Sequence, residues 1–138
     1  MEVYHGTSRA AVTDIKKNGI KPCGGGELGK GFYVGNMEHM AFIWAIHTKG
    51  KGNVCIICFD FDDNHFLELN PLILERNKAI EVRKQIKSIE KQREYVFGSN
   101  AIWADVVGIN HPGFEQIKFE EADGIKFINK ANKIYVEK

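Results

Sequence analysis

A cluster of glycines near the N-terminus has the residue types and spacing of a phosphate-binding loop. Six of the 14 glycines fall within a dozen positions, at Gly24, Gly25, Gly26, Gly29, Gly31 and Gly35. Residues 24–30 match the first letters of the dinucleotide and P-loop motifs. The dinucleotide motif must lead into a helix, but residues 31–34 are typical of a strand, and the P-loop motif needs Ser or Thr where Gly31 stands. A flexible loop whose glycines supply unusual backbone angles is the alternative interpretation.

Three short blocks between residues 4 and 97 use more of the chain. They are His5-Gly6-Thr7, Gly29-Lys-Gly-Phe-Tyr33-Val-Gly35 and Glu94-Tyr-Val-Phe97. In order and spacing they resemble the signature blocks of the diphtheria-toxin-like ADP-ribosyltransferases, the His-Tyr-Glu clade that includes the poly(ADP-ribose) polymerases and small bacterial toxins. The second aromatic residue of that family lies eleven positions after the motif tyrosine, which is Trp44 in this sequence.

The resemblance implies an enzyme that binds NAD as a substrate, needs no metal and transfers ADP-ribose to a macromolecular acceptor, either a protein or a nucleic acid. Tyr33 and Trp44 would hold the flat cationic nicotinamide ring between aromatic faces, although core packing is the alternative for both. Gly6 would offer its main chain to the carboxamide. His5, supported by Thr7, would hydrogen-bond to the adenosine ribose.

Glu94 is the expected catalytic residue. A carboxylate at the start of a central strand would stabilise the positive charge that develops on the ribose, and would orient or deprotonate a nucleophile. Glu27 and Glu90 are competing glutamates. Gln92 stands where some relatives have a residue that helps to select the acceptor, but it is also a natural end for a helix.

Three other functions compete with this interpretation. NAD hydrolysis would use the same site with water as the acceptor. The RNA 2′-phosphotransferase branch resembles this fold and also uses NAD, but the glutamate block and the Tyr33 context speak against it. A module that binds NAD, ADP-ribose or a partner without turnover belongs to another class altogether.

The three cysteines indicate neither a disulfide scaffold nor a metal site. Cys55 and Cys58 form a C-x-x-C pair inside residues 54–61, an apolar run typical of a buried strand. Residues three apart on a strand point to opposite faces, so both are expected to be core cysteines. The sequence shows no signal peptide and no apolar stretch of about 20 residues, so we expect a cytoplasmic protein without a membrane span.

The helices and strands that we expect to position these residues indicate an α+β fold. We expect a single domain over residues 1–138, with a compact split β-sheet, two N-terminal helices and one middle helix. The 138 residues are 43% hydrophobic and 27% charged, which excludes general disorder. Helices are expected at 8–18 (capped by Ser8 and ended by Gly19), 37–47 (capped by Asn36) and 74–92. Strands are expected at 3–5, 31–34, 54–61, 66–69, 94–97, 105–109, 115–119, 125–128 and 133–136.

The segment from residue 76 to 93 is strongly basic although the whole chain carries only +1. It holds seven Lys and Arg against two Glu, a net charge of +5. Such a helix can guide an acidic protein or nucleic-acid target toward an active site. A solvated helix face is the alternative, because no aromatic residues are interleaved for base stacking.

Overall fold

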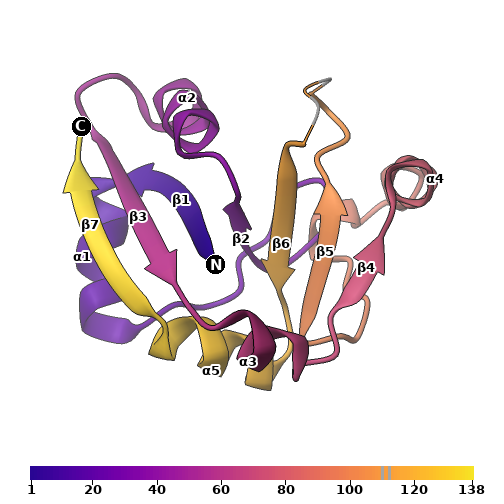
Figure 1. Cartoon of the computed structure of the whole chain (residues 1–138). Coiled ribbons are helices and arrows are strands. Elements are labelled where there is room, and N and C mark those ends of the chain that lie inside the picture. Colours follow the sequence, from indigo (N-terminus) through magenta and orange to yellow (C-terminus); the bar gives the residue numbers. More distant parts are fainter. Residues whose placement is uncertain (110, 112) are drawn as a thin grey trace.

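The computed structural model describes residues 1–109, 111 and 113–138, which form a mixed α+β structure around one seven-stranded sheet (Figure 1). The strands are β1 (Glu2–Ser8), β2 (Phe32–Gly35), β3 (Val54–Asp60), β4 (Leu72–Leu74), β5 (Ala101–Asp105), β6 (Glu115–Phe119) and β7 (Asn132–Glu137). The helices are α1 (Arg9–Asn18), α2 (Glu38–Lys49), α3 (Asp63–Leu67), α4 (Arg76–Lys87), α5 (Ala122–Lys130) and a 3-10 helix, η1 (Gln92–Glu94). The α+β class predicted from the sequence is confirmed.

The sheet consists of two halves that meet between β1 and β2. Its strand order is β4-β5-β6-β2-β1-β3-β7, in which β4 and β5 are parallel and the other neighbours are antiparallel. Strand β1 pairs with β3 along its whole length, but within the described residues it pairs with β2 only at Tyr4 and Gly35. Figure 1 shows the resulting divide, with β1, β3 and β7 on one side and β6, β5 and β4 on the other.

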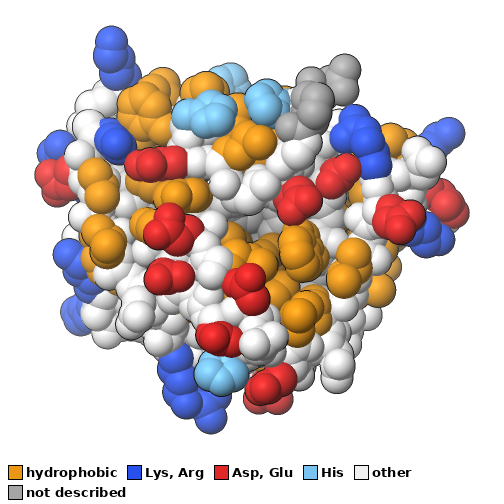
Figure 2. Space-filling model, viewed as in Figure 1, with side chains coloured by type: hydrophobic (Ala, Val, Ile, Leu, Met, Phe, Trp, Pro, Cys, Tyr) orange, Lys and Arg blue, Asp and Glu red, His pale blue; other side chains and the backbone are white. Residues whose placement is uncertain are grey.

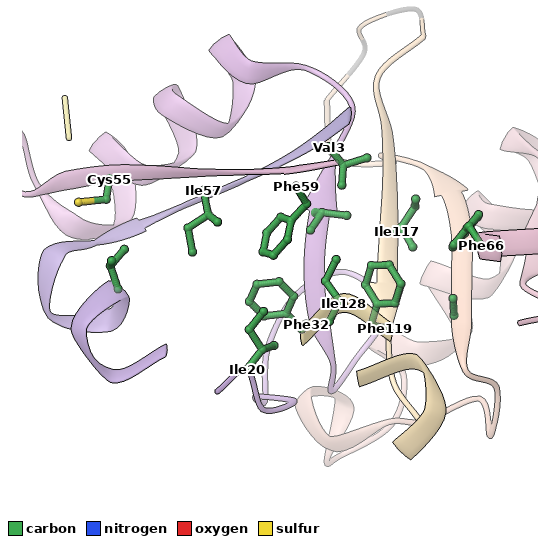
Figure 3. Packing of buried hydrophobic residues seen from close by; sticks show 13 residues of the cluster. Val3, Ile20, Phe32, Cys55, Ile57, Phe59, Phe66, Ile117, Phe119 and Ile128 are labelled. Atoms are coloured by element: carbon green, nitrogen blue, oxygen red, sulfur yellow. The ribbon is translucent and has the colours of Figure 1, made fainter. Parts of the chain in front are cut away.

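Both faces of the sheet are covered by helices. On one face, α1, α3 and α5 enclose the largest hydrophobic cluster, in which Phe32, Phe59 and Phe119 come from three different strands (Figure 3). On the other face, α2 covers β1 and β3, while α4 covers β5. Strand β3 is apolar from Val54 to Phe59 because this part is covered on both faces. Cys55 and Cys58 accordingly lie on opposite faces of the sheet as free thiols, as predicted.

The first helix forms as its capping residues dictate. The Ser8 hydroxyl accepts a hydrogen bond from Ala11 N at 3.1 Å, and Gly19 N donates to Ile15 O at 2.8 Å. The second helix does not use Asn36, so that predicted cap is wrong. The Asn36 side chain instead donates to Gly113 O at 2.7 Å and accepts from Glu115 N at 2.8 Å, which holds the start of β6.

Several predicted elements are wrong, and two of the errors have a local cause. Residues 66–69 form the end of the short helix α3 and the turn after it, not a strand. The helix begins after Asp62, whose side chain caps it by accepting a hydrogen bond from His65 N at 3.1 Å. Residues 125–128 belong to α5, whose buried Gly124 and Ile128 are one helical turn apart. A short apolar run does not distinguish a strand from such a helix. The strand expected at 105–109 is β5, which lies earlier, and the middle helix ends at Lys87.

Candidate functional site

Glu94 does not lie at the start of a central strand, which corrects the sequence prediction for its position. It is the last residue of η1, its side chain is exposed, and residues 95–97 form no strand. The amide groups that follow bind a carboxylate and do not join a sheet: Phe97 N and Gly98 N donate to Glu120 at 3.0 and 2.6 Å. The third block is therefore an irregular segment held by Glu120, the residue that follows β6.

The glycine-rich loop packs directly against this turn. Gly25 N donates to Arg93 O at 3.2 Å, and Lys30 N donates to Tyr95 O at 2.9 Å. The second and third blocks are therefore neighbours in space. The Glu27 side chain anchors the loop, since its carboxylate accepts hydrogen bonds at 2.8 Å from Val107 N and 2.9 Å from the Gln116 amide. A carboxylate inside the loop disfavours the phosphate-binding interpretation.

In this structure Tyr33 and Trp44 have different surroundings, and their role on either side of a nicotinamide ring stays a prediction. The Tyr33 hydroxyl accepts a hydrogen bond from Leu28 N at 3.1 Å and donates to Gly29 O at 2.5 Å, so the ring is fixed beneath the glycine loop. Trp44, on α2, is 59% exposed. Among the ring contacts of the described residues, none joins these two side chains. Gly26 lies against the Tyr33 ring so closely that a Cβ at that position would overlap it.

The first block is divided between the two faces of the sheet. His5 stacks on Phe32, with ring centroids 4.3 Å apart, and its Nδ1 hydrogen-bonds to Tyr33 O at 2.6 Å. Burial lowers the pKa of His5, so the neutral imidazole is favoured. Thr7 is buried within the sheet. Gly6 lies on the other face, under α2, where a Cβ would overlap the carbonyl oxygen of Ala41.

A cavity of about 100 Å³ opens where the two halves of the sheet meet. Its lining comes from the N-terminal segment, the end of β2, and strands β5 and β6: Met1, Val3, Gly35, Asn36, Trp103, Glu115 and Ile117. Glu115 is the first residue of β6, a central strand, and its Oε1 accepts a hydrogen bond from Trp103 Nε1 at 3.0 Å. Val3 and His5 point to the same face of β1, so the imidazole lies one strand repeat from this lining.

Sequence reasoning missed Glu115 and Trp103. The strand prediction at 115–119 already placed Glu115 at a strand start, which is the position expected of the catalytic carboxylate. The resemblance of residues 94–97 to the family block favoured Glu94 as the catalytic carboxylate instead. Trp103 was missed because the strand prediction began at residue 105, beyond it.

A larger and shallower hollow, of about 570 Å³, lies beside this cavity and shares Met1 with it. Its lining includes three aspartates among Asp60, Phe61, Asp62, Asp63, Asn64 and Asn132. Figure 2 shows acidic side chains gathered around the hollowed middle of this face, with hydrophobic side chains in and beside the hollow. The Met1 ammonium group pairs with Asp60 and Asp63, at 3.7 and 2.8 Å, so part of the negative charge around this hollow is neutralised.

The described residues contain neither a membrane-spanning helix nor a metal-binding group. None of the helices there has the length and apolar character that crossing a membrane requires. In residues 1–109, 111 and 113–138, His, Cys, Asp and Glu side chains do not form a group of three or more that could hold a metal ion. Comparison of the chain with protein-family models and with curated proteins gave no match.

Proposed function

We propose that this chain is an NAD-dependent ADP-ribosyltransferase in which Glu115, and not Glu94, is the carboxylate beside the reacting ribose. The observation that carries the proposal is the cavity at the divide of the sheet. There Val3 of β1, Gly35 of β2 and Glu115 of β6 meet. The first block reaches the second through the hydrogen bond of His5 to the Tyr33 main chain, and the third block packs on the glycine loop through Tyr95.

The size and lining of the cavity suit one ring of a dinucleotide. A volume of about 100 Å³ is well below that of pockets which enclose a whole drug-sized ligand, so only the nicotinamide end would enter. The Glu115 carboxylate and the Trp103 indole are the partners that a flat cationic ring prefers. His5, neutral and on the same face, has a second ring nitrogen that can bond to a ribose hydroxyl.

In the proposed reaction the bond between the ribose C1′ and the nicotinamide nitrogen breaks, and its electron pair leaves with neutral nicotinamide. A nucleophilic oxygen or nitrogen of the acceptor forms the new bond to C1′ and loses its proton to Glu115 or to solvent. The carboxylate stabilises the positive charge on the ribose between these events. NAD hydrolysis is the same chemistry with water as the acceptor, and a binding module would use the cavity without turnover.

The test compares Glu115→Gln with Glu94→Gln. Glutamine keeps an oxygen that accepts from Trp103, so the fold around the cavity is preserved while the charge is removed. Nicotinamide release from labelled NAD is expected to fall about 10²-fold or more in Glu115→Gln, with NAD affinity measured by calorimetry changed only a few-fold. Glu94→Gln should release nicotinamide at the wild-type rate.

The possible contrary results differ in meaning. Loss of release in Glu94→Gln alone would return catalysis to Glu94. Unchanged release in both variants would exclude these carboxylates, and a wild-type protein that binds NAD without turnover would be a binding module. Adding a cell extract and following the labelled adenosine separates transfer to a macromolecule from hydrolysis.

A further inference from the structure

The basic segment between residues 76 and 93 keeps its charge unneutralised in the folded protein. Its seven basic side chains are Arg76, Lys78, Arg83, Lys84, Lys87, Lys91 and Arg93. Of these seven side chains, Lys78 alone forms an ion pair with a described residue, with Glu81 at 3.8 Å. Since the segment carries +5 and the whole chain +1, the rest of the chain carries −4. The positive charge is therefore concentrated on α4 and the turn that follows it.

The fold sorts these charges onto one flank of α4. The helix buries Ala79, Val82 and Ile86, which fixes its orientation on the sheet. At 100° per residue, Arg76, Arg83, Lys84 and Lys87 project from one side of this buried face, while Lys78 and Glu81 project from the other side. We call the first group the basic stripe. It spans the 12 residues of α4, from Arg76 to Lys87, or about 16 Å at a rise of 1.5 Å per residue.

The basic stripe continues onto the glycine loop. Arg83 donates from Nη1 to Glu27 O at 2.9 Å, and Arg93 donates from Nη2 to Gly24 O at 3.4 Å. Both partners are main-chain carbonyl groups, so the guanidinium charges are positioned without being cancelled. Lys84 and Lys87 are exposed to solvent.

We propose that the basic stripe binds the phosphate backbone of a duplex nucleic acid. A row of cations that have no ion-pair partner among the described residues matches a polyanion with regularly spaced charges. A protein interface needs a buried apolar or aromatic centre, and within α4 the described residues of this flank expose a single large apolar side chain, Ile80, at 41%. Residues 76–93 contain no aromatic side chain, so the stacking that single-stranded nucleic acids require is missing and a duplex is favoured.

The test measures fluorescence anisotropy of fluorescein-labelled 20-base-pair DNA and RNA duplexes, without NAD, between 50 and 200 mM salt. The variant Lys84→Gln/Lys87→Gln removes two charges of the basic stripe. The control Lys78→Gln/Lys126→Gln removes two exposed charges outside the basic stripe, one on the other flank of α4 and one on α5. Loss of two phosphate contacts should lower the slope of log K against log salt by about two and weaken binding roughly tenfold at 50 mM salt. The control should stay within about twofold of the wild type.

Three results would overturn the proposal: no duplex binding by the wild type at 50 mM salt, equal weakening in both double variants, or binding of labelled poly-glutamate as tight as that of the duplexes. The last result would assign the basic stripe to acidic proteins. Because NAD is absent, the outcome is independent of whether the chain is a transferase.

Discussion

The ammonium group of Lys118 lies 2.6 Å from the Glu120 carboxylate, and both side chains are buried. Lys118 also donates to Leu28 O in the glycine loop at 2.7 Å, while Glu120 binds the main chain at Phe97 and Gly98. One ion pair at the end of β6 thus joins the glycine loop, which leads into the second sequence block, to the third block. The two blocks are positioned by residues that belong to neither.

Replacing Lys118 by methionine should destabilise the protein strongly. The substitution keeps the volume but leaves the buried Glu120 carboxylate without its cation, a change that costs roughly 3–5 kcal/mol of unfolding free energy. Urea denaturation followed by circular dichroism measures the loss. Lys78→Met breaks an exposed pair and should change stability by less than about 0.5 kcal/mol. Equal effects of the two substitutions would contradict a structural role for the buried pair.

Gly29→Ala should also be destabilising, and Gly52→Ala is its matched control. Both glycines have a φ of +89°, so alanine is strained at either position. At Gly29 a Cβ would in addition overlap Tyr95 O, whereas nothing lies within 4 Å at Gly52. We expect Gly52→Ala to cost about 1 kcal/mol and Gly29→Ala to cost at least about 1 kcal/mol more. Similar unfolding midpoints for the two variants would mean that the glycine loop moves away from Tyr95 without cost.

The sequence predicts the elements whose signals are local. Helix α1 follows from Ser8 and Gly19, and β3 follows from its apolar run. Residues 94–97 have the composition of a strand, but their position is set by contacts with residues more than twenty positions away, at Glu120 and Lys118. No spacing rule within the block reveals such partners.

The sequence predicted the strands that carry part of the candidate site, but not how the side chains of the site are arranged. The strands expected at 3–5 and 31–34 are present, and the hydrogen bond of His5 to Tyr33 O joins them. The sequence did not predict the direction of each side chain. Tyr33 and His5 face opposite sides of the sheet, and α2 lies directly on Gly6. The predicted strand 115–119 places Glu115 at a strand start, but its position at the cavity follows from the sheet order, which places β6 beside β2. Strand order depends on long-range pairing that one sequence does not display.

The two tryptophans give a matched pair for the proposed ring site. Trp103→Phe keeps an aromatic face in the cavity but removes the N–H that donates to Glu115. Hydrogen bonds to charged groups contribute about 1.5–3 kcal/mol, so we expect nicotinamide release to fall about tenfold or more. Trp44→Phe changes an exposed side chain on α2 and should leave release within about twofold. If Trp44→Phe lowers release and Trp103→Phe does not, the ring binds at α2, as the sequence resemblance implies.

The unfolding free energy should depend on pH through His5. Burial lowers the pKa of this imidazole, and the Lys49 charge lowers it further, while the hydrogen bond to Tyr33 O opposes both effects only in part. The unfolded state has an ordinary His pKa of about 6.5, so it takes up a proton as the pH falls through that value while the folded state does not. Stability from His5 is therefore present above pH 6.5 and lost below it.

Urea denaturation of the wild type and of His5→Gln at pH 5 and pH 8 isolates this effect, because the other four histidines are common to both proteins. The wild type should lose more stability between pH 8 and pH 5 than the variant does. Parallel losses would show that His5 is as accessible to protons in the folded protein as in the unfolded chain. In that case the imidazole would be charged at mildly acidic pH and would no longer accept a hydrogen bond from a ribose hydroxyl.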